Sequence, residues 1–327
     1  MKIGLVTPAA PGSLAGNRAT ATRWARRLRA AGHRVRVRER WDVGDPVFDV
    51  LLALHAWRSA PSIAAFAERY PDRPRVVVLT GTDIYRFQHT DPAVTKASLG
   101  RAHALIGLHD HVHRDIPARF HPILHTVHQS ASPLPPSYRG PLTDRFELCV
   151  VGHLREEKDS LRAALAARDL PSGSRIRITQ AGRAHTAEWA QAAEAEADAN
   201  PRYRWVGEIG QAAIRRLYAR SRAMVMSSVM EGGANVVSEA CVAGLPVLAS
   251  DIPGNTGLLG DHYPGLYPAQ DTAALCALMS RTETDPDFLA DLAMRCRALA
   301  PRFTPAAEQA ALCRAIDAAV EHAHGLS

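Results

Sequence analysis

The stretch AMVMSSVMEGGANVVSEACVAGLPVLAS, residues 223–250, predicts a strand, a helix and a second strand in succession. An apolar run at 223–228 is followed by two glycines, a helical segment at 235–243 and a second apolar run at 246–250. Short runs rich in Val, Leu and Ile that alternate with helices are typical of a parallel sheet covered on both faces. This stretch therefore predicts an α/β fold.

The same alternation continues outward and divides the chain into two halves. The stretch SASPLPPSYRGPLTD, residues 130–144, is rich in proline and serine and is typical of an interdomain linker. We therefore expect a doubly wound domain at 1–140, a second one at 141–303 and a C-terminal helix at 304–327. The expected strands are 2–7, 34–38, 49–54, 75–80, 104–108 and 123–127, then 147–152, 175–181, 203–207, 223–228 and 246–250. The expected helices include 16–31, 159–168, 186–199, 210–220, 235–243, 271–281 and a last one ending near Ala323.

Length and composition exclude several classes of protein. The chain has 327 residues, 46% of them hydrophobic, which suits two globular domains. Its five cysteines include no C-x-x-C pair, which argues against a disulfide scaffold or a cysteine-rich zinc module. No apolar run approaches the roughly 20 residues of a membrane span, and the N-terminus lacks a signal-peptide pattern. We expect a cytoplasmic protein with reduced thiols.

The formal net charge is +6, and nine arginines fall between Arg18 and Arg40 against a single acid, Glu39. A solvated helix face followed by an edge strand accounts for this cluster. A basic surface that faces a membrane or an acceptor is the alternative. Nucleic acid is not an expected partner, because no known binding motif occurs and aromatic residues do not interleave with the arginines.

The segment from Glu231 to Glu239 combines residues suited to a sugar nucleotide. Gly232 and Gly233 precede a helix that Asn235 is expected to cap, so backbone N–H groups can approach an anion such as a diphosphate. The helix dipole adds partial positive charge there. Glu239 can accept hydrogen bonds from two vicinal hydroxyls, as a ribose presents. A glycine-rich loop with ordinary surface charge is the alternative.

A second polar loop occurs in VVGHLREEKDSLRAAL, residues 150–165. Gly152 permits a tight turn at the end of a strand, and His153, Arg155 and Lys158 follow before a helix. Cations at this position can neutralise a leaving diphosphate and so lower the barrier to breaking a glycosidic bond without a metal. An ordinary charged loop is the alternative.

The first half contains weaker candidates for the binding of a second anion. The loop 12–18 opens the first helix, and its Gly16, Asn17 and Arg18 are a candidate oxyanion cradle. It lacks the lysine of a P-loop, which disfavours a kinase, and the absence of G-x-G-x-x-G disfavours a dehydrogenase. A tight turn is the alternative.

The stretch 80–83 follows another strand and should reach the ligand edge of the sheet, which makes Thr82, Asp83 and Arg86 candidates, with Arg58 behind them. A helix cap is the alternative role for Asp83. The histidines 109, 111 and 113 alternate and on a strand would share one face, as a metal site requires. They follow a strand in a loop or helix start, so we expect no metal there and assign His109 to acceptor positioning or to the surface.

The second half resembles the donor domain of the retaining glycosyltransferases of family 4. The family pattern G-R-L-x-x-E-K-G corresponds to Gly152, His153, Leu154, Glu157 and Lys158, and its E-x7-E pattern to Glu231 and Glu239. The resemblance implies the GT-B fold: two Rossmann-like domains facing across a cleft, with the C-terminal helix crossing back to the first domain.

The resemblance also implies roles for individual residues. Lys158 would bind the diphosphate and Glu239 the ribose. Glu231 and the amides of 232–235, including Ala234, would lie at the sugar and phosphates. The backbone at 206–209, with Glu208, would border the base. His153 stands where the family has arginine, so we assign that charge to Arg155, and Asp159 replaces the usual glycine.

Narrower motifs resemble a smaller group, the selenosugar synthases of selenoneine biosynthesis. These motifs are HLREEKD (153–159), LTGTDIYR (79–86), VHQSA (127–131) and SDIPGNTGLLGDHYPGLYP (250–268). The resemblance implies a UDP-hexose donor, with UDP-N-acetylglucosamine as the expected one, selenophosphate as acceptor and a 1-seleno sugar as product. It implies retention of configuration, no metal and no cofactor beyond the sugar nucleotide. Enzymes that supply selenophosphate or use the product could be partners.

The resulting prediction assigns catalysis to Lys158, Glu231, Arg155 and Asp83. Donor binding is assigned to Gly152, His153, Glu208, Gly232, Gly233, Ala234, Asn235 and Glu239, and acceptor binding to Gly16, Asn17, Arg18, Thr82, Arg86 and His109. Selenium in selenophosphate is a soft and already anionic nucleophile, so a strong general base is not required. Two alternatives stay open: a family 4 transferase that glycosylates a hydroxyl or a lipid, and a UDP-sugar binding protein without activity.

Overall fold

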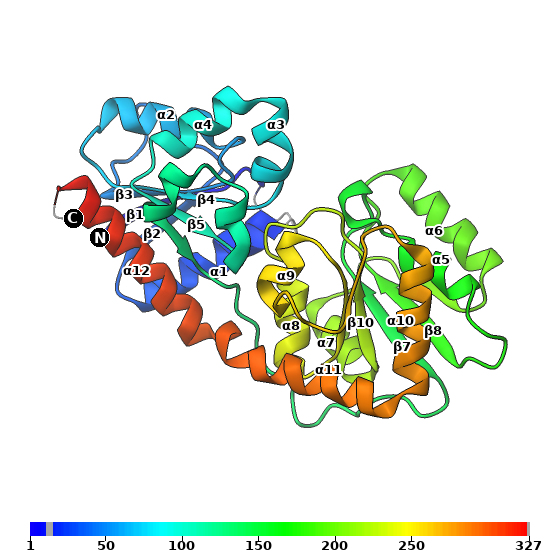
Figure 1. Ribbon diagram of the computed structural model, residues 1–327. Helices are drawn as coiled ribbons and strands as arrows, with labels where there is room; N and C mark the ends of the chain where they lie inside the picture. The colour runs from blue at the N-terminus through cyan, green and yellow to red at the C-terminus, as the bar shows by residue number, and fades with distance from the viewer. Residues whose placement is uncertain (11–15, 326–327) are drawn as a thin grey trace. The chain divides into compact units, whose positions relative to one another are not determined.

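The computed structural model describes residues 1–10 and 16–325, and these form two compact units (Figure 1). The first unit combines Met1–Gln129 with Pro305–Ser327, and the second is Ser130–Thr304. The sheet of each unit consists of six parallel strands. The α/β architecture expected from the alternating apolar runs is therefore confirmed in both halves.

The sheet of the first unit has the order β2-β1-β3-β4-β5-β6. Its strands are β1 (Lys2–Val6), β2 (Arg34–Arg38), β3 (Val50–Leu54), β4 (Arg75–Val78), β5 (Ala104–Gly107) and β6 (Leu124–Thr126). Its helices are α1 (Gly16–Ala30), α2 (Ala60–Arg69), α3 (Gln88–Thr90), α4 (Pro92–Gly100) and α12 (Pro305–Ala323), with short helical turns η1 (Asp83–Phe87), η2 (Asp110–Arg114) and η3 (Ala118–Ile123). Every residue of β3 and β4 is buried, because helices cover both faces of the sheet.

Two apolar clusters cover the opposite faces of this sheet. One joins Trp24 and Leu28 of α1 to Leu312 and Ile316 of α12. The other contains Phe66 of α2, among others. Figure 1 shows α1 and α12 on one side of the strands and α2, α3 and α4 on the other.

The C-terminal helix α12 is anchored to α1 by a buried ion pair. The carboxylate of Glu308 has no exposed side-chain surface. It accepts hydrogen bonds from Arg23 Nε at 2.9 and 3.2 Å and from Trp24 Nε1 at 2.8 Å. The predicted return of the C-terminal helix to the first half of the chain is therefore confirmed.

The sheet of the second unit has the order β12-β11-β10-β7-β8-β9. Its strands are β7 (Phe146–Val151), β8 (Ile176–Ala181), β9 (Tyr203–Trp205), β10 (Ala223–Met226), β11 (Val247–Ser250) and β12 (Leu266–Tyr267). Its helices are α5 (Arg162–Arg168), α6 (Ala187–Ala199), α7 (Gln211–Arg220), α8 (Asn235–Ala243), α9 (Pro253–Leu259), α10 (Thr272–Thr284) and α11 (Pro286–Leu299), with turns η4 (Glu156–Lys158) and η5 (Ala300–Phe303).

Three elements of the second unit were not predicted, and one helix begins later than expected. Strand β12 is only two residues long, too short for a period to show. Helices α9 and α11 each begin at a proline, Pro253 and Pro286, which fits the first turn of a helix. The helix expected from residue 159 begins at Arg162, after the turn η4.

Candidate active site

The loops that follow β7 and β8 meet through two glycines. A Cβ atom on Gly182 would lie 1.8 Å from the carbonyl oxygen of Gly152, so only glycine fits this approach. Gly182 N also donates to Gly207 O at 2.8 Å, which brings the loop after β9 to the same edge. Glu208 is exposed in that loop, and its assignment to the base of the nucleotide stays a prediction.

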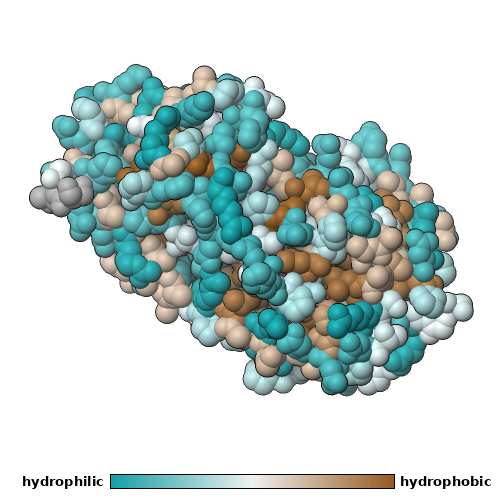
Figure 2. Space-filling view, in the orientation of Figure 1, coloured by the Kyte–Doolittle hydropathy of each residue, from teal (hydrophilic) through white to brown (hydrophobic). Residues whose placement is uncertain are grey.

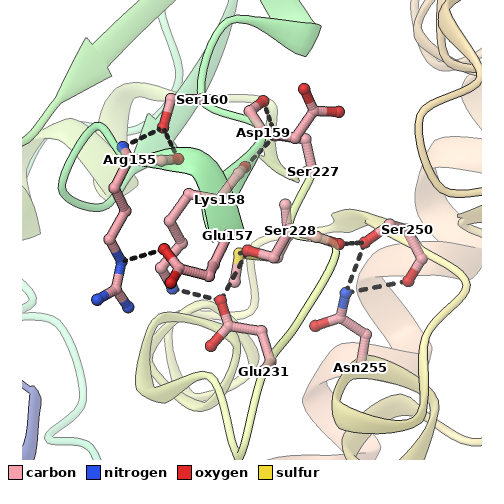
Figure 3. A network of polar contacts seen from close by, with 11 residues as sticks. Arg155, Glu157, Lys158, Asp159, Ser160, Ser227, Ser228, Glu231, Ser250 and Asn255 are labelled. Carbon is pink, nitrogen blue, oxygen red and sulfur yellow. Dashed lines mark hydrogen bonds and ion pairs between the residues drawn. The ribbon is translucent and has the colours of Figure 1, made fainter. Parts of the chain in front are cut away.

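Lys158 and Glu231 form an ion pair between the loops that follow β7 and β10 (Figure 3). Their side chains are 19% and 10% exposed, so both are largely shielded but still reachable from solvent. The hydroxyl of Ser228 donates to the same Glu231 oxygen, Oε1, at 2.7 Å. Two residues that the sequence places 73 positions apart thus share one small polar site.

Asp159 has the left-handed backbone conformation that explains why the family pattern has glycine here. Its φ is 44° and its ψ 53°, and aspartate is one of the few non-glycine residues that tolerate this region. Arg162 Nε donates to Asp159 Oδ2 at 2.7 Å, and Ser227 Oγ donates to the Asp159 carbonyl at 3.0 Å. These contacts hold the turn that presents Lys158.

Arg155 lies in the same loop, at the position from which it could replace the family arginine. Its Nε atom is 3.8 Å from Glu157 Oε2, and its side chain is 38% exposed. Its backbone is anchored by Ser160, whose Oγ accepts from Arg155 N at 3.0 Å. Figure 3 shows Arg155, Glu157, Lys158 and Glu231 on one side of this network. His153 is half-buried beside them.

Helix α8 begins at Asn235, and Ala234 takes the N-cap position. The predicted capping role of Asn235 is therefore wrong. Its side chain points along the helix instead, and Nδ2 donates to Glu239 Oε1 at 2.7 Å. The loop before it contains Gly232, which is buried, and Gly233, whose φ is 141°.

Glu239 has a second partner that the sequence did not indicate. The hydroxyl of Tyr218, on α7, donates to Glu239 Oε2 at 2.8 Å. Tyr218 is 2% exposed, and burial together with the neighbouring carboxylate raises its pKa well above 10. No sequence motif marks Tyr218, because it belongs to an ordinary amphipathic helix.

A buried hydrogen-bond network supports the loop that contains Glu231. Asn255 Nδ2 donates to the carbonyl and to the hydroxyl of Ser250, each at 3.0 Å, and Ser250 Oγ donates to the Ser228 carbonyl (Figure 3). A Cβ on Gly254 would lie 2.2 Å from the Glu231 carbonyl oxygen, so glycine is required for this approach. The stretch SDIPGN thus supports the position of Glu231.

In the first unit, Asp83 is fully buried and surrounded by backbone donors. Its two carboxylate oxygens accept hydrogen bonds at 2.7–3.2 Å from the N–H groups of Ala56, Thr80, Gly81 and Ile84. This geometry gives the carboxylate the task of ordering the loops after β3 and β4. The helix-cap role considered for Asp83 is not observed, because Thr82 takes the N-cap position of η1 and Asp83 is its first residue.

His55, which was not among the predicted site residues, contacts Thr82. It follows β3 directly, where ligands of parallel sheets bind, and this position is the signal that could have identified it. Its φ of 72° lies in the left-handed region. Nδ1 accepts from Arg58 N at 3.1 Å, so Nε2 carries the proton and donates to Thr82 Oγ1 at 2.9 Å. Burial lowers the pKa of this imidazole, which keeps it neutral.

His109 is fully buried, and both ring nitrogens have partners. Nδ1 accepts from His111 N at 3.2 Å, and Nε2 bonds Tyr85 Oη at 2.9 Å, whose hydroxyl donates to Asp115 at 3.0 Å. Burial lowers the pKa of His109 to about 3. Its assignment to the acceptor stays a prediction, and the geometry leaves its ring little access to a ligand.

The remaining acceptor candidates lie at the starts of α1 and η1. Gly16, Asn17 and Arg18 are the first residues of α1, whereas residues 12–15 of the predicted cradle lie outside the described residues. Arg86 is half-buried in η1. Within residues 1–10 and 16–325, no group of three His, Cys, Asp or Glu side chains is arranged to hold a metal ion.

Five of the nine arginines in the segment 18–40 make ion pairs or hydrogen bonds within the first unit, and two of them, Arg23 and Arg27, pair with Glu308. Besides the pairing with Glu308, Arg38 pairs with Asp45, Arg40 pairs with Asp42, and Arg29 donates to the Val35 carbonyl. None of the helices that the structure describes is both long and apolar enough to cross a bilayer. On the face that Figure 2 shows, apolar residues lie in patches among hydrophilic ones.

Several solved structures share this fold. Anabaena Alr3699/HepE, solved with UDP and glucose, matches with a TM-score of 0.77 at 15% identity over 97% of this chain and 99% of that one. Sucrose-phosphate synthase from Thermosynechococcus elongatus matches with a TM-score of 0.77 at 16% identity over 96% and 97%. A TarM variant from S. aureus, solved with fondaparinux, α-GlcNAc-glycerol and UDP, matches with 0.65 at 13% identity over 82% and 55%. No curated protein matches the sequence.

Two parallel Rossmann-like sheets and a C-terminal helix that returns to the first of them define a GT-B protein. Residues 139–299 match the family model described as glycosyl transferases group 1. The chain therefore has the GT-B fold, and its residues 139–299 belong to the glycosyl transferases group 1 family.

Proposed function

We propose that this protein transfers a hexosamine or hexose from a UDP-sugar to selenophosphate, with retention of configuration. The observation that carries the donor half of the proposal is the Lys158–Glu231 pair, together with the anchored carboxylate of Glu239 on the helix that follows Glu231. The relatives solved with UDP, HepE and TarM, support the choice of nucleotide. UDP-N-acetylglucosamine is the donor to test first.

Each donor-side residue has a distinct task in this proposal. The diphosphate replaces Glu231 as the partner of Lys158, and it accepts hydrogen bonds from the backbone N–H groups of the loop 232–235 at the start of α8. Glu239 accepts the ribose hydroxyls. Glu231, released from Lys158, lies beside the transferred sugar. Arg155 adds the second positive charge, and the pair of cations stabilises the negative charge that develops on the leaving UDP.

The acceptor half of the proposal is supported by the four narrow motifs. One of them, 250–268, contributes the Asn255–Ser250 support beneath Glu231, and another, 79–86, contains the buried Asp83. We assign acceptor contacts to Thr82, Arg86 and the start of α1. For Asp83 we propose an ordering role in place of a catalytic one.

The proposed transfer balances without a redox step. The selenium lone pair of selenophosphate attacks the anomeric carbon, the bond from that carbon to the UDP oxygen breaks, and UDP leaves with the electron pair. The first product is a sugar–Se–phosphate ester and UDP. Hydrolysis of its Se–P bond by water then gives the 1-seleno sugar and phosphate.

The test is UDP release from UDP-N-acetylglucosamine with and without selenophosphate, followed by mass spectrometry of the product. We expect release that depends on selenophosphate and a hexosamine product with the isotope pattern of selenium. Donor that stays intact, or is consumed equally without selenophosphate, contradicts the acceptor assignment.

Transfer to a hydroxyl is the second candidate function. The α-GlcNAc-glycerol named with the TarM structure favours it, since that compound is a glycoside of a hydroxyl group. Release of UDP that requires a glycerol or lipid hydroxyl, and not selenophosphate, would establish this alternative.

A further inference from the structure

The carboxylate of Glu239 is held from two helices at once. Asn235, one turn earlier on α8, donates to Oε1 at 2.7 Å, and Tyr218 on the neighbouring α7 donates to Oε2 at 2.8 Å. Glu239 is half-buried, whereas Tyr218 is only 2% exposed. The tyrosine therefore approaches the carboxylate from the core.

Tyr218 can act only as a donor in this contact. Burial raises the pKa of the phenol well above 10, and the adjacent carboxylate raises it further. The hydroxyl therefore stays protonated near neutral pH, and a hydrogen bond to an ionised acceptor is stronger than one between neutral groups. The ring belongs to the apolar core of the second unit, where close packing restricts its rotation.

We propose that Tyr218 is a positioning residue for ribose recognition: it fixes Glu239 so that the carboxylate meets the vicinal hydroxyls of the nucleotide. This inference depends on the proposed function, because it takes the nucleotide to be a ribonucleoside diphosphate. A diol is recognised by two acceptor oxygens in a defined plane. A glutamate held by Asn235 alone populates more rotamers than one held by both residues, and only part of that population presents both oxygens correctly.

The substitution Tyr218→Phe removes one hydroxyl and keeps the ring. If the fraction of molecules whose Glu239 can accept both ribose hydroxyls falls to between about a third and a tenth of the wild-type value, the apparent Kd for UDP rises by about 3- to 10-fold. The 2′,3′-dideoxy analogue of UDP lacks both hydroxyls, so its Kd should not respond. The ratio of the two Kd values therefore isolates the ribose contact from any general change in the protein.

The experiment is titration calorimetry of UDP and 2′,3′-dideoxy-UDP on the wild-type chain and two variants. Tyr203→Phe is the matched control, because Tyr203 is 4% exposed and donates its hydroxyl to Gln180 Oε1 at 2.8 Å in the same unit. Melting temperatures are recorded for each protein to compare folding. Steady-state kinetics with the UDP-sugar should show a raised donor KM and a nearly unchanged kcat for Tyr218→Phe.

Three outcomes separate the possibilities. The proposal is supported if the wild type prefers UDP and Tyr218→Phe narrows that preference by about 3- to 10-fold, whereas Tyr203→Phe does not. It is overturned, with the ribose role of Glu239 intact, if Tyr218→Phe keeps the full preference. If the wild type binds UDP and 2′,3′-dideoxy-UDP equally well, Glu239 does not contact the ribose hydroxyls. That result overturns both this inference and the assignment of Glu239 to the donor site.

Discussion

Replacing Lys158 with alanine removes the ammonium group from the ion pair with Glu231, which joins the loops after β7 and β10. In this variant Glu231 keeps the hydrogen bond from Ser228, and its side chain, 10% exposed beside Lys158, becomes more accessible to water. The carboxylate is thus partly hydrated and retains one donor. We expect a loss of folding stability of about 1–2 kcal/mol, below the 3–5 kcal/mol typical of breaking a fully buried pair.

The effect on turnover should be much larger. The Lys158 side chain is 19% exposed, so an effective dielectric constant near 20 is appropriate. One unit charge about 4 Å from a phosphate oxygen then contributes about 4 kcal/mol, close to the 2.7–4 kcal/mol measured for removing one stabilising donor in other enzymes. We expect kcat/KM to fall by about 10²–10³-fold.

The assay measures UDP release and melting temperature for the wild type, Lys158→Ala and Lys96→Ala. Lys96 is exposed on α4 of the other unit and controls for the loss of a lysine charge. Lys158→Ala should melt within about 10 °C of the wild type, since 1 kcal/mol shifts the melting temperature by about 2–4 °C in units of this size. Turnover within threefold of the wild type would refute the electrostatic role of Lys158.

Three further predictions concern the scaffold. Glu308→Gln should lower the free energy of unfolding by about 3–5 kcal/mol, because it removes the buried carboxylate that pairs with Arg23. Urea titration at neutral pH measures this loss, and a loss under about 1 kcal/mol would contradict the prediction. Asp159→Gly should keep the free energy of unfolding within about 1 kcal/mol of the wild type, whereas Asp159→Val should lower it by about 1–3 kcal/mol, because valine is strained in the left-handed backbone conformation of residue 159. Equal melting temperatures for the two variants would contradict this argument. The His109 pKa of about 3 means that the unfolded chain binds more protons between pH 6.5 and 3, so stability should fall as the pH falls through that range. Urea titrations at pH 7 and 5 test this, and His109→Asn should lose less between them than the wild type.

Much of the fold was predictable because its signals are local. The runs at 76–78 and 223–226 are apolar over their whole length, as strands buried on both faces usually are. Strand β12 and helix α11 were not predicted, because β12 is only two residues long and polar and apolar residues are mixed along α11. The cap of α8 was misplaced by one residue, since an asparagine at the first helical position looks the same in sequence as one at the cap.

The amino-acid sequence by itself predicted the α/β class, most of the strands and helices, and the candidate side chains of the donor site, since spacing and residue type express these locally. Lys158, Glu231 and Glu239 were proposed as donor-site residues for this reason. Only the tertiary structure decided that Tyr218 holds Glu239, that backbone amides surround Asp83 and that His109 is fully buried. Those facts join residues far apart in the chain, and burial and hydrogen-bond partners arise only when packing brings such residues together.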